Sequence, residues 1–333
     1  MDIFLQQIVN GLVLGSVYAL VALGYTMVYG ILGLINFAHG EVVMVGALTA
    51  LSVVNALMSA HVGVPAPVIG VAALIVALSV CMALGFLIER VAYRPLRRAP
   101  RLAPLITAIG VSIVLQTLAM MIWGRGYHTV PPIIAPTPHS FGGATITSVQ
   151  ILIIVVSALI MVGLLCLVHF TRLGRAMRAT AENPVVAGLM GVNINRIISA
   201  TFLIGSALAA VAGVLVSSNY GIAHYYMGFV LGLKAFTAAV LGGIGNLAGA
   251  MLGGLLLGLI ESFGAGYIGQ ITDLCQFGFL LHASGEIAQR CSGNSSLPLF
   301  GSNYQDVFAF LVLVLVLVFR PTGLIGERVA ERA

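Results

Sequence analysis

The sequence predicts an all-α protein that crosses a membrane many times. Of its residues, 60% are hydrophobic and only 8% are charged. The apolar residues form continuous runs of about twenty, the length at which a helix spans about 30 Å of hydrocarbon. Strands of an outer-membrane barrel would instead alternate apolar and polar residues over about ten positions. We therefore expect a single transmembrane domain over residues 1–333, with about eight to ten transmembrane helices.

The basic residues predict how this domain is oriented. Five arginines lie in residues 90–101, four in 171–196 and three in 320–332, and together they are most of the 15 Lys and Arg residues. Cytoplasmic loops of membrane proteins carry an excess of Lys and Arg. All three segments, and the C-terminus with them, are therefore expected in the cytoplasm.

The first apolar stretch, residues 5–38, is longer than one span requires. It is either one long tilted helix or a broken pair, which gives nine or ten crossings in total. A polar group, Asn36 to Glu41, follows it. Asn36 could cap the next helix, and Glu41 would gain from the positive end of that helix dipole. Ionisable groups this close to a span are functional candidates, and the alternative is a helix-to-helix turn that satisfies its own backbone.

Five further spans are expected in order before the next glycine-rich stretch. Their apolar runs are residues 42–60, 68–88, 104–123, 151–170 and 197–216. Residues 125–150 hold four prolines and few charges, which predicts a semi-rigid, exposed loop on the outer side.

The segment 171–196 is the longest charged interruption between apolar runs and contains a short helix with marked ends. Asn183 suits the N-cap, Pro184 the first helical position, and Gly191 the left-handed conformation that ends a helix. This predicts about two turns, too short to cross a bilayer. Apolar residues at helical spacing, Val186 and Leu189 among them, suit a groove on a partner. The alternative is a surface connector with ordinary caps.

Two spans must fit into residues 229–263, with the turn at Gly242 to Asn246, where glycines permit unusual φ values. Glycines at four-residue spacing, such as Gly254 and Gly258, predict close approach of another helix. Lys234, in the first of these spans, either snorkels, pairs with an acid such as Glu261, or faces a watery cavity.

Residues 264–304 form the longest polar segment and are expected on the outer, periplasmic side. Cys275 and Cys291 lie within it and either form a disulfide or stay unpaired. The last span is the apolar run 307–319, whose helix should begin near Tyr304.

Several chemistries have no motif in this chain. It lacks the phosphate-binding GxxxxGK[ST] loop, an HExxH zinc helix and a GxSxG nucleophile elbow. We therefore expect no enzymatic activity, no catalytic residue, no cofactor and no metal site. An ion-coupled carrier usually needs acids at mid-depth, and only Glu41 and Glu261 are candidates. A subunit driven by a separate ATPase instead needs a cytoplasmic element that the ATPase can bind and move.

Five segments carry a resemblance to a known family. They are GILGLINFAHGE at 30–41, AMRATAENP at 176–184, LMGVN at 189–193, LGGIGN at 241–246 and RPTGLIG at 320–326. With these motifs the chain resembles permease subunits of bacterial branched-chain amino-acid ABC importers, most closely the H-type permease. The resemblance implies an inner-membrane protein that works by alternating access. It also implies three kinds of partner: an M-type permease, two cytoplasmic ABC ATPases, and a periplasmic amino-acid-binding protein that delivers leucine, isoleucine or valine.

The resemblance also implies site residues. The family's ATPase-contacting loop matches residues 181–193 here, so the expected coupling residues are Ala181, Glu182, Asn183, Pro184, Ala187, Leu189, Met190 and Gly191. The expected translocation-pathway candidates are Asn36, His39, Glu41, Gly243, Gly245 and Asn246.

The chain departs from the family at one place. The GYIG at 266–269 and the GSNYQD at 301–306 adjoin in the family, and about thirty residues separate them here. We interpret residues of about 274–300 as an insertion on the periplasmic face. Two alternative functions also stay open, a urea or short-chain amide permease of the same family and an ion-coupled secondary carrier.

Overall fold

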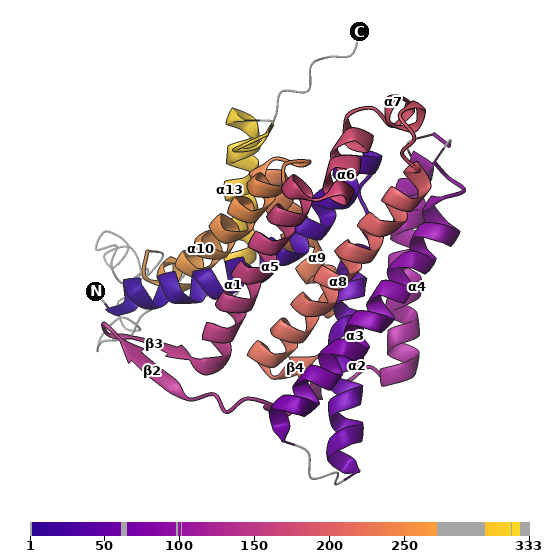
Figure 1. Ribbon diagram of the computed structural model, residues 1–333. Helices are drawn as coiled ribbons and strands as arrows, with labels where there is room; N and C mark the ends of the chain where they lie inside the picture. The colour runs from indigo at the N-terminus through magenta and orange to yellow at the C-terminus, as the bar shows by residue number, and fades with distance from the viewer. Residues whose placement is uncertain are drawn as a thin grey trace, which may run out of the picture.

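A computed structural model describes residues 2–60, 65–97, 99–100, 102–271, 304–320 and 322–326 (Figure 1). The elements in chain order are α1 (Asp2–Leu32), α2 (His39–Ser59), α3 (Ala66–Ile88), the π-helical turn η1 (Glu89–Tyr93), α4 (Leu102–Trp123), β1 (His128–Thr129), β2 (Pro138–Phe141), β3 (Ala144–Thr147), α5 (Ser148–Phe170), α6 (Arg172–Glu182), α7 (Pro184–Leu189), α8 (Ile194–Tyr220), β4 (Ile222–Ala223), α9 (Met227–Gly242), α10 (Leu247–Ile271) and α13 (Gln305–Phe319).

The predicted class is confirmed. Within the described ranges, seven helices are long and apolar enough to cross a membrane, and two shorter apolar stretches, Met227–Gly242 and Ala309–Phe319, accompany them. The molecule is therefore an all-α, multi-pass membrane protein.

Helices α1 and α8 form the centre of the bundle. In the most apolar part of α1, 89% of the residues are buried, and the corresponding share in α8 is 67%. Helices α3, α4 and α5 bury less than a third of theirs, so they lie at the periphery and present apolar side chains to lipid or to another protein.

The first apolar stretch forms one helix, not a pair. Helix α1 runs unbroken to Leu32, and Gly33 then turns the chain with φ +65°. The next residues lead back into the bundle, where α2 begins with His39 and Glu41 already buried. The start of α2 therefore lies inside the protein.

Small residues bring α1 and α10 together, as the glycine spacing predicts. A Cβ on Gly15 would lie 2.7 Å from Leu255 Cα, and one on Gly254 would lie 2.5 Å from Ala19 Cα. These distances are shorter than real carbon contacts, so only glycine permits this backbone approach.

Part of the proline-rich loop is ordered into a hairpin that the sequence analysis did not predict. Strands β2 and β3 pair antiparallel, and the Thr147 hydroxyl caps α5 directly after them. Gln6 of α1 accepts a hydrogen bond from Thr145 N at 2.8 Å. The hairpin is therefore fixed to the first helix.

The C-terminal helices follow the expected order, and α10 is longer than predicted. Residues 264–271 continue α10, and α13 begins at Gln305 after its N-cap Tyr304, as expected. Lys234 pairs with Glu261, at 2.6 Å, and also with Asp306, at 2.7 Å. Cys275, Cys291 and the proposed insertion at 274–300 lie outside the described residues.

Candidate functional site

Helix α7 has the caps that the sequence predicts. Asn183 Oδ1 accepts hydrogen bonds from Val185 N at 3.0 Å and Val186 N at 3.1 Å. Pro184 occupies the first turn, and Gly191 takes a φ of +87° beyond the C-terminal end. The segment is therefore a helix with defined ends, as predicted.

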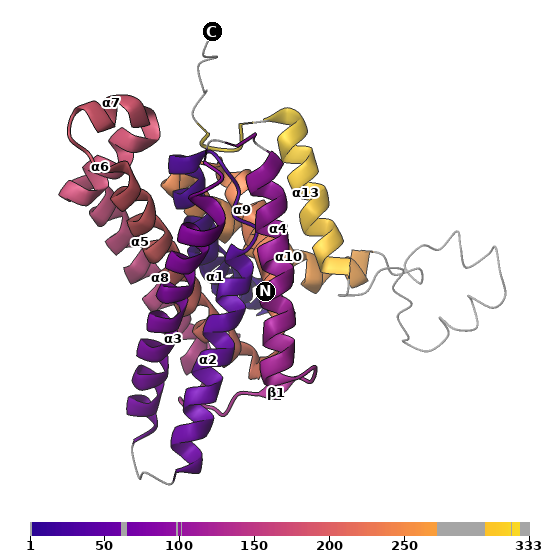
Figure 2. The same ribbon diagram turned by 90° about the vertical axis from the view of Figure 1, so that its right-hand side faces the viewer.

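The outer surface of α7 is apolar and exposed. Val185 is 70% exposed, Leu189 83% and Met190 81%, whereas Ala187 is buried against the rest of the protein. In Figure 2, α7 stands clear at one end of the bundle. Apolar side chains exposed on a short helix beyond the membrane helices are typical of a surface that a partner covers.

The structure adds α6, which the sequence analysis missed. Thr171 Oγ1 caps it by accepting a hydrogen bond from Gly174 N at 3.0 Å, and Met177 and Thr180 turn inward. Helix α6 contacts α1, α5, α7 and α8. Leu173, Met177 and Thr180 at three- and four-residue spacing could have revealed it, but its four charged residues hid it from a search for apolar runs.

The described parts of the three basic segments lie at one end of the bundle. Figure 1 places α7, the connection from η1 to α4 and the end of α13 together there. Arg97 joins two of them, because its Nη1 donates to Asn195 Oδ1 at 2.6 Å and its Nη2 to Glu89. Ser199 Oγ donates to the other oxygen of Glu89 at 2.8 Å. Burial lowers the pKa of Arg97, and the nearby Glu89 opposes that shift, so the guanidinium keeps its charge.

The same π-helical turn reaches the polar group before α2. Tyr93 OH donates a hydrogen bond to Asn36 Oδ1 at 2.9 Å. The expectation that Asn36 caps α2 is wrong, since the N-cap is Ala38 and no side chain caps this helix end. Asn36 instead binds η1, and η1 in turn contacts the start of α8.

His39 fills a space made by glycines. Its ring occupies the place where a Cβ on Gly24 would be, and its Cε1 lies 3.7 Å from the Cβ position of Gly205. The His39 and Tyr25 rings are packed edge to face, with their centroids 4.9 Å apart. His39 therefore locks α2 between α1 and α8. Its Nε2 has no hydrogen-bond partner in the part of the chain that the structure describes.

Glu41 is fully buried in the first turn of α2. Its Oε1 accepts hydrogen bonds from Ser112 Oγ at 3.0 Å and Gln116 Nε2 at 2.7 Å, both on α4. Its Oε2 has no hydrogen-bond partner among the described residues. That oxygen lies 2.9 Å from the position of a Cβ on Gly228, so a larger residue there would contact the carboxylate.

A cavity of about 390 Å³ lies between α1, α4 and α9, beside this carboxylate. It is lined by Tyr25, Phe37, Ile109, Ser112, Ile113, Gln116, Tyr226, Gly228, Phe229, Gly232 and Leu233. Its size is within the range of small-molecule sites, and a mostly apolar lining with a few polar groups is typical of them.

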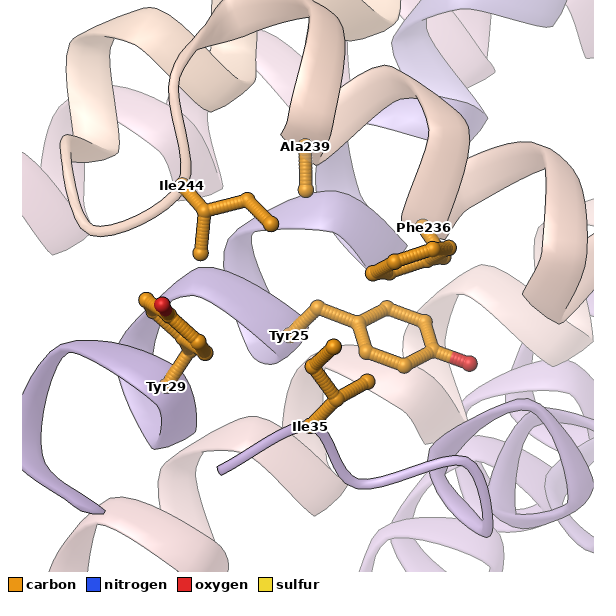
Figure 3. Close-up of a pocket in the computed structure, with 6 residues that line it drawn as sticks. All are labelled: Tyr25, Tyr29, Ile35, Phe236, Ala239 and Ile244. Atoms are coloured by element: carbon orange, nitrogen blue, oxygen red, sulfur yellow. The ribbon is translucent and has the colours of Figure 1, made fainter. Parts of the chain in front are cut away.

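The Tyr25 ring separates this cavity from a much smaller one. Figure 3 shows Tyr25 beside Phe236, with Tyr29, Ile35, Ala239 and Ile244 completing a pocket of about 10 Å³, the size of one water molecule. Along α9 the larger cavity comes first, then Phe236, then the turn that holds Ile244. The pocket on that side of Tyr25 therefore admits about one water molecule.

The turn itself holds the C-terminal segment. Gly243 and Gly245 have φ values of +110° and +99°, and they flank Ile244 of the small pocket. Leu324 N donates to Leu241 O at 2.9 Å, and Asn246 Nδ2 donates to Ile325 O at 3.1 Å. None of the six pathway candidates lines the large cavity itself. Glu41 is next to it, because it contacts the lining residues Ser112, Gln116 and Gly228, while the turn residues lie at the end of α9.

The fold and site define a class: a multi-pass helical membrane protein with a small-molecule-sized cavity in its bundle and a short, exposed apolar helix at one end. Comparison with known proteins specifies the class further. The family model described as "Branched-chain amino acid transport system / permease component" matches residues 7–317. The chain belongs to this permease family.

Relatives match along the whole chain. The high-affinity branched-chain amino acid transport system permease protein BraD of Pseudomonas aeruginosa is 47% identical over 335 residues, which cover 99% of this chain and 98% of the relative. The permease protein LivH of Escherichia coli K12 is 42% identical and covers 99% and 97%. The probable permease LivM of Methanocaldococcus jannaschii is 25% identical over 94% of this chain. No solved structure gives a significant match.

Proposed function

We propose that this chain is the membrane-spanning permease subunit of an ATP-driven importer that moves leucine, isoleucine and valine across the bacterial inner membrane. Near-full-length relatives of 42% and 47% identity are transport permeases for branched-chain amino acids by name. The chain contributes the pathway and hydrolyses no ATP itself. Two separate cytoplasmic ATPases supply the energy, an M-type permease completes the pathway, and a periplasmic binding protein delivers the substrate.

The observation that carries this proposal is the exposed apolar surface of α7. Its residues Val185, Val186, Leu189 and Met190 are all more than half exposed. This surface shares one end of the bundle with the described arginines of the three basic segments, among them Arg97, Arg172 and Arg320, which favours the cytoplasm for α7 and for the C-terminus. An amphipathic helix presented in this way suits a groove on an ATPase.

A chain of contacts leads from α7 to the start of α2. Helix α7 packs on α8, whose first turns carry Asn195 and Ser199. These two side chains bind the Arg97 and Glu89 pair, and η1 binds Asn36 through Tyr93. Movement of α7 by an ATPase would therefore shift the polar group that precedes Glu41 and the large cavity.

The pathway runs through the large cavity and is closed at Tyr25 and Phe236. The ring centroids of these two residues lie 6.2 Å apart, and the space beyond them admits about one water molecule. Ile113 and Phe229 at the cavity are exposed, and Gln116 lies with them. Because a polar side chain facing lipid is unfavourable, we place the M-type permease over this opening.

Replacing Leu189 tests the docking surface. Leu189→Arg puts a charge into the proposed apolar contact and should reduce co-purification of the ATPases with the permease pair by about tenfold or more. Leu189→Met keeps an apolar side chain of similar volume and should retain the ATPases. Both variants should insert into the membrane normally, since residue 189 makes no buried contact in the bundle.

Membrane-extracted, tagged complexes provide the readout, with the ATPase bands quantified against the permease. Wild-type amounts of ATPase on the Leu189→Arg complex would contradict the assignment of α7 as the docking helix.

A further inference from the structure

We propose that the large cavity binds the substrate's α-ammonium group through the negative charge of Glu41, with Gln116 and Ser112 as the contacting acceptors. This inference rests on the proposed function and adds a recognition site for amino acids within the permease itself. The site would hold a zwitterion with a branched apolar side chain while it passes through the membrane.

The hydrogen bonds around Glu41 leave acceptors for a cation. Ser112 and Gln116 both donate to the same oxygen, Oε1. Donation through its nitrogen leaves the amide oxygen of Gln116, a cavity-lining residue, able to accept a hydrogen bond. The second carboxylate oxygen, Oε2, has no partner among the described residues and lies against Gly228, which also lines the cavity.

No cationic side chain pairs with Glu41 within the described part of the chain. The salt bridges there join Arg97 to Glu89 and Lys234 to Glu261 and Asp306, and none reaches Glu41. Glu41 lies in the first turn of α2, and the first turn of α9 lies against its Oε2. Each helix N-terminus supplies about half a positive charge, but neither places a cationic side chain there. A buried carboxylate without a full counter-ion favours a cation beside it.

Among the other nearby residues, Tyr25, His39 and the apolar lining place no cationic side chain in the large cavity. Tyr25 contributes its ring to the wall, and His39 packs away from the cavity between Gly24 and Gly205. The remaining lining is aromatic or aliphatic, mainly Phe37, Ile109, Phe229 and Leu233. Such walls suit a branched aliphatic side chain, while Glu41 and its partners supply the polar side.

The test measures leucine moved per ATP hydrolysed by the complete complex in liposomes, with the binding protein loaded with leucine. Glu41→Gln keeps the shape and removes the charge, so leucine uptake should fall by about tenfold, the effect of losing one charged hydrogen bond. ATPase stimulation by the loaded binding protein should stay close to wild type, so the leucine-to-ATP ratio falls.

Companion variants separate recognition from structure. Glu41→Asp keeps the charge and should move more leucine per ATP than Glu41→Gln does. Gln116→Leu keeps Glu41 and should move severalfold less leucine per ATP than wild type. Ser79→Ala, on the exposed side of α3, removes a hydroxyl that donates to Ile75 O of its own helix and should match wild type. A purely structural role for Glu41 would instead lower uptake and ATPase stimulation together and leave the ratio unchanged.

The outcomes distinguish the two proposals. An unchanged ratio in Glu41→Gln, with wild-type leucine uptake intact, overturns the ammonium site and leaves the permease function standing. If Glu41→Gln does not assemble, an unchanged ratio in Gln116→Leu overturns it. If the wild-type complex moves no leucine under ATP, the proposed function fails, and the ammonium site fails with it.

Discussion

Lys234 connects four helices through one buried group of charges. Its ammonium lies between Glu261 of α10 and Asp306 of α13, and Tyr18 OH of α1 donates to the other oxygen of Glu261 at 2.8 Å. The sequence predicted the Glu261 pair as one of three alternatives. Asp306 and Tyr18 were not foreseen, because their proximity depends on how α1 and α13 pack against α9.

Replacing Lys234 should destabilise the bundle. Lys234→Met leaves the buried Glu261 without its cation, and breaking a buried ion pair costs about 3–5 kcal/mol. Asp306, whose side chain is 41% exposed, loses the same partner at a smaller cost. We expect a clearly lower melting temperature of the detergent-solubilised protein. Lys234→Arg keeps the charge and should melt much closer to wild type. Equal melting of the Met variant and wild type would show that the pair does not stabilise the bundle.

The contacts of Glu41, like those of Lys234, could not be predicted from the sequence. Its polarity next to an apolar run marked it as a functional candidate, but Ser112, Gln116 and Gly228 carried no signal of their own in the sequence. A serine or glutamine within an apolar helix identifies no partner until the helices are packed. The cavity beside Glu41 was therefore not predictable from the sequence.

At the scale of elements, the sequence predicted what depends on local chemistry. Long apolar runs predicted the spans, and Asn183 and Gly191 predicted the ends of α7. The glycines at 242–246 predicted the turn between α9 and α10. Helix α6, the β2–β3 hairpin and the π-helical turn were missed. The first has too few apolar residues to resemble a span, and the other two depend on contacts with distant segments.

The link from η1 to the polar group before α2 gives a prediction at this scale. Tyr93→Phe removes the hydrogen bond to Asn36 and keeps the ring that packs against Phe202 at 5.4 Å. If η1 transmits the movement of α7, this variant should bind ATPases normally and move severalfold less leucine per ATP.

Tyr127→Phe is the matched control, since it removes an exposed hydroxyl in the loop that follows α4. A normal ratio of leucine to ATP in Tyr93→Phe would show that α7 acts on α2 through other contacts.

The whole molecule combines a buried centre with exposed sides. Helices α1 and α8 are enclosed, whereas α3, α4 and α5 are mostly exposed within this chain, so their apolar sides face lipid or another protein. Composition predicted the membrane class, and five short motifs predicted the family. The position of the cavity at an exposed side required the three-dimensional structure.

The central claim is that the energy for transport enters from separate ATPases through α7. Its most direct test compares radiolabelled leucine accumulation in binding-protein-loaded liposomes that contain the two permeases with and without the ATPases. We predict accumulation only when the ATPases and ATP are both present, and its loss with Leu189→Arg. Accumulation without ATPases that an ionophore abolishes would contradict the claim and indicate an ion-coupled carrier.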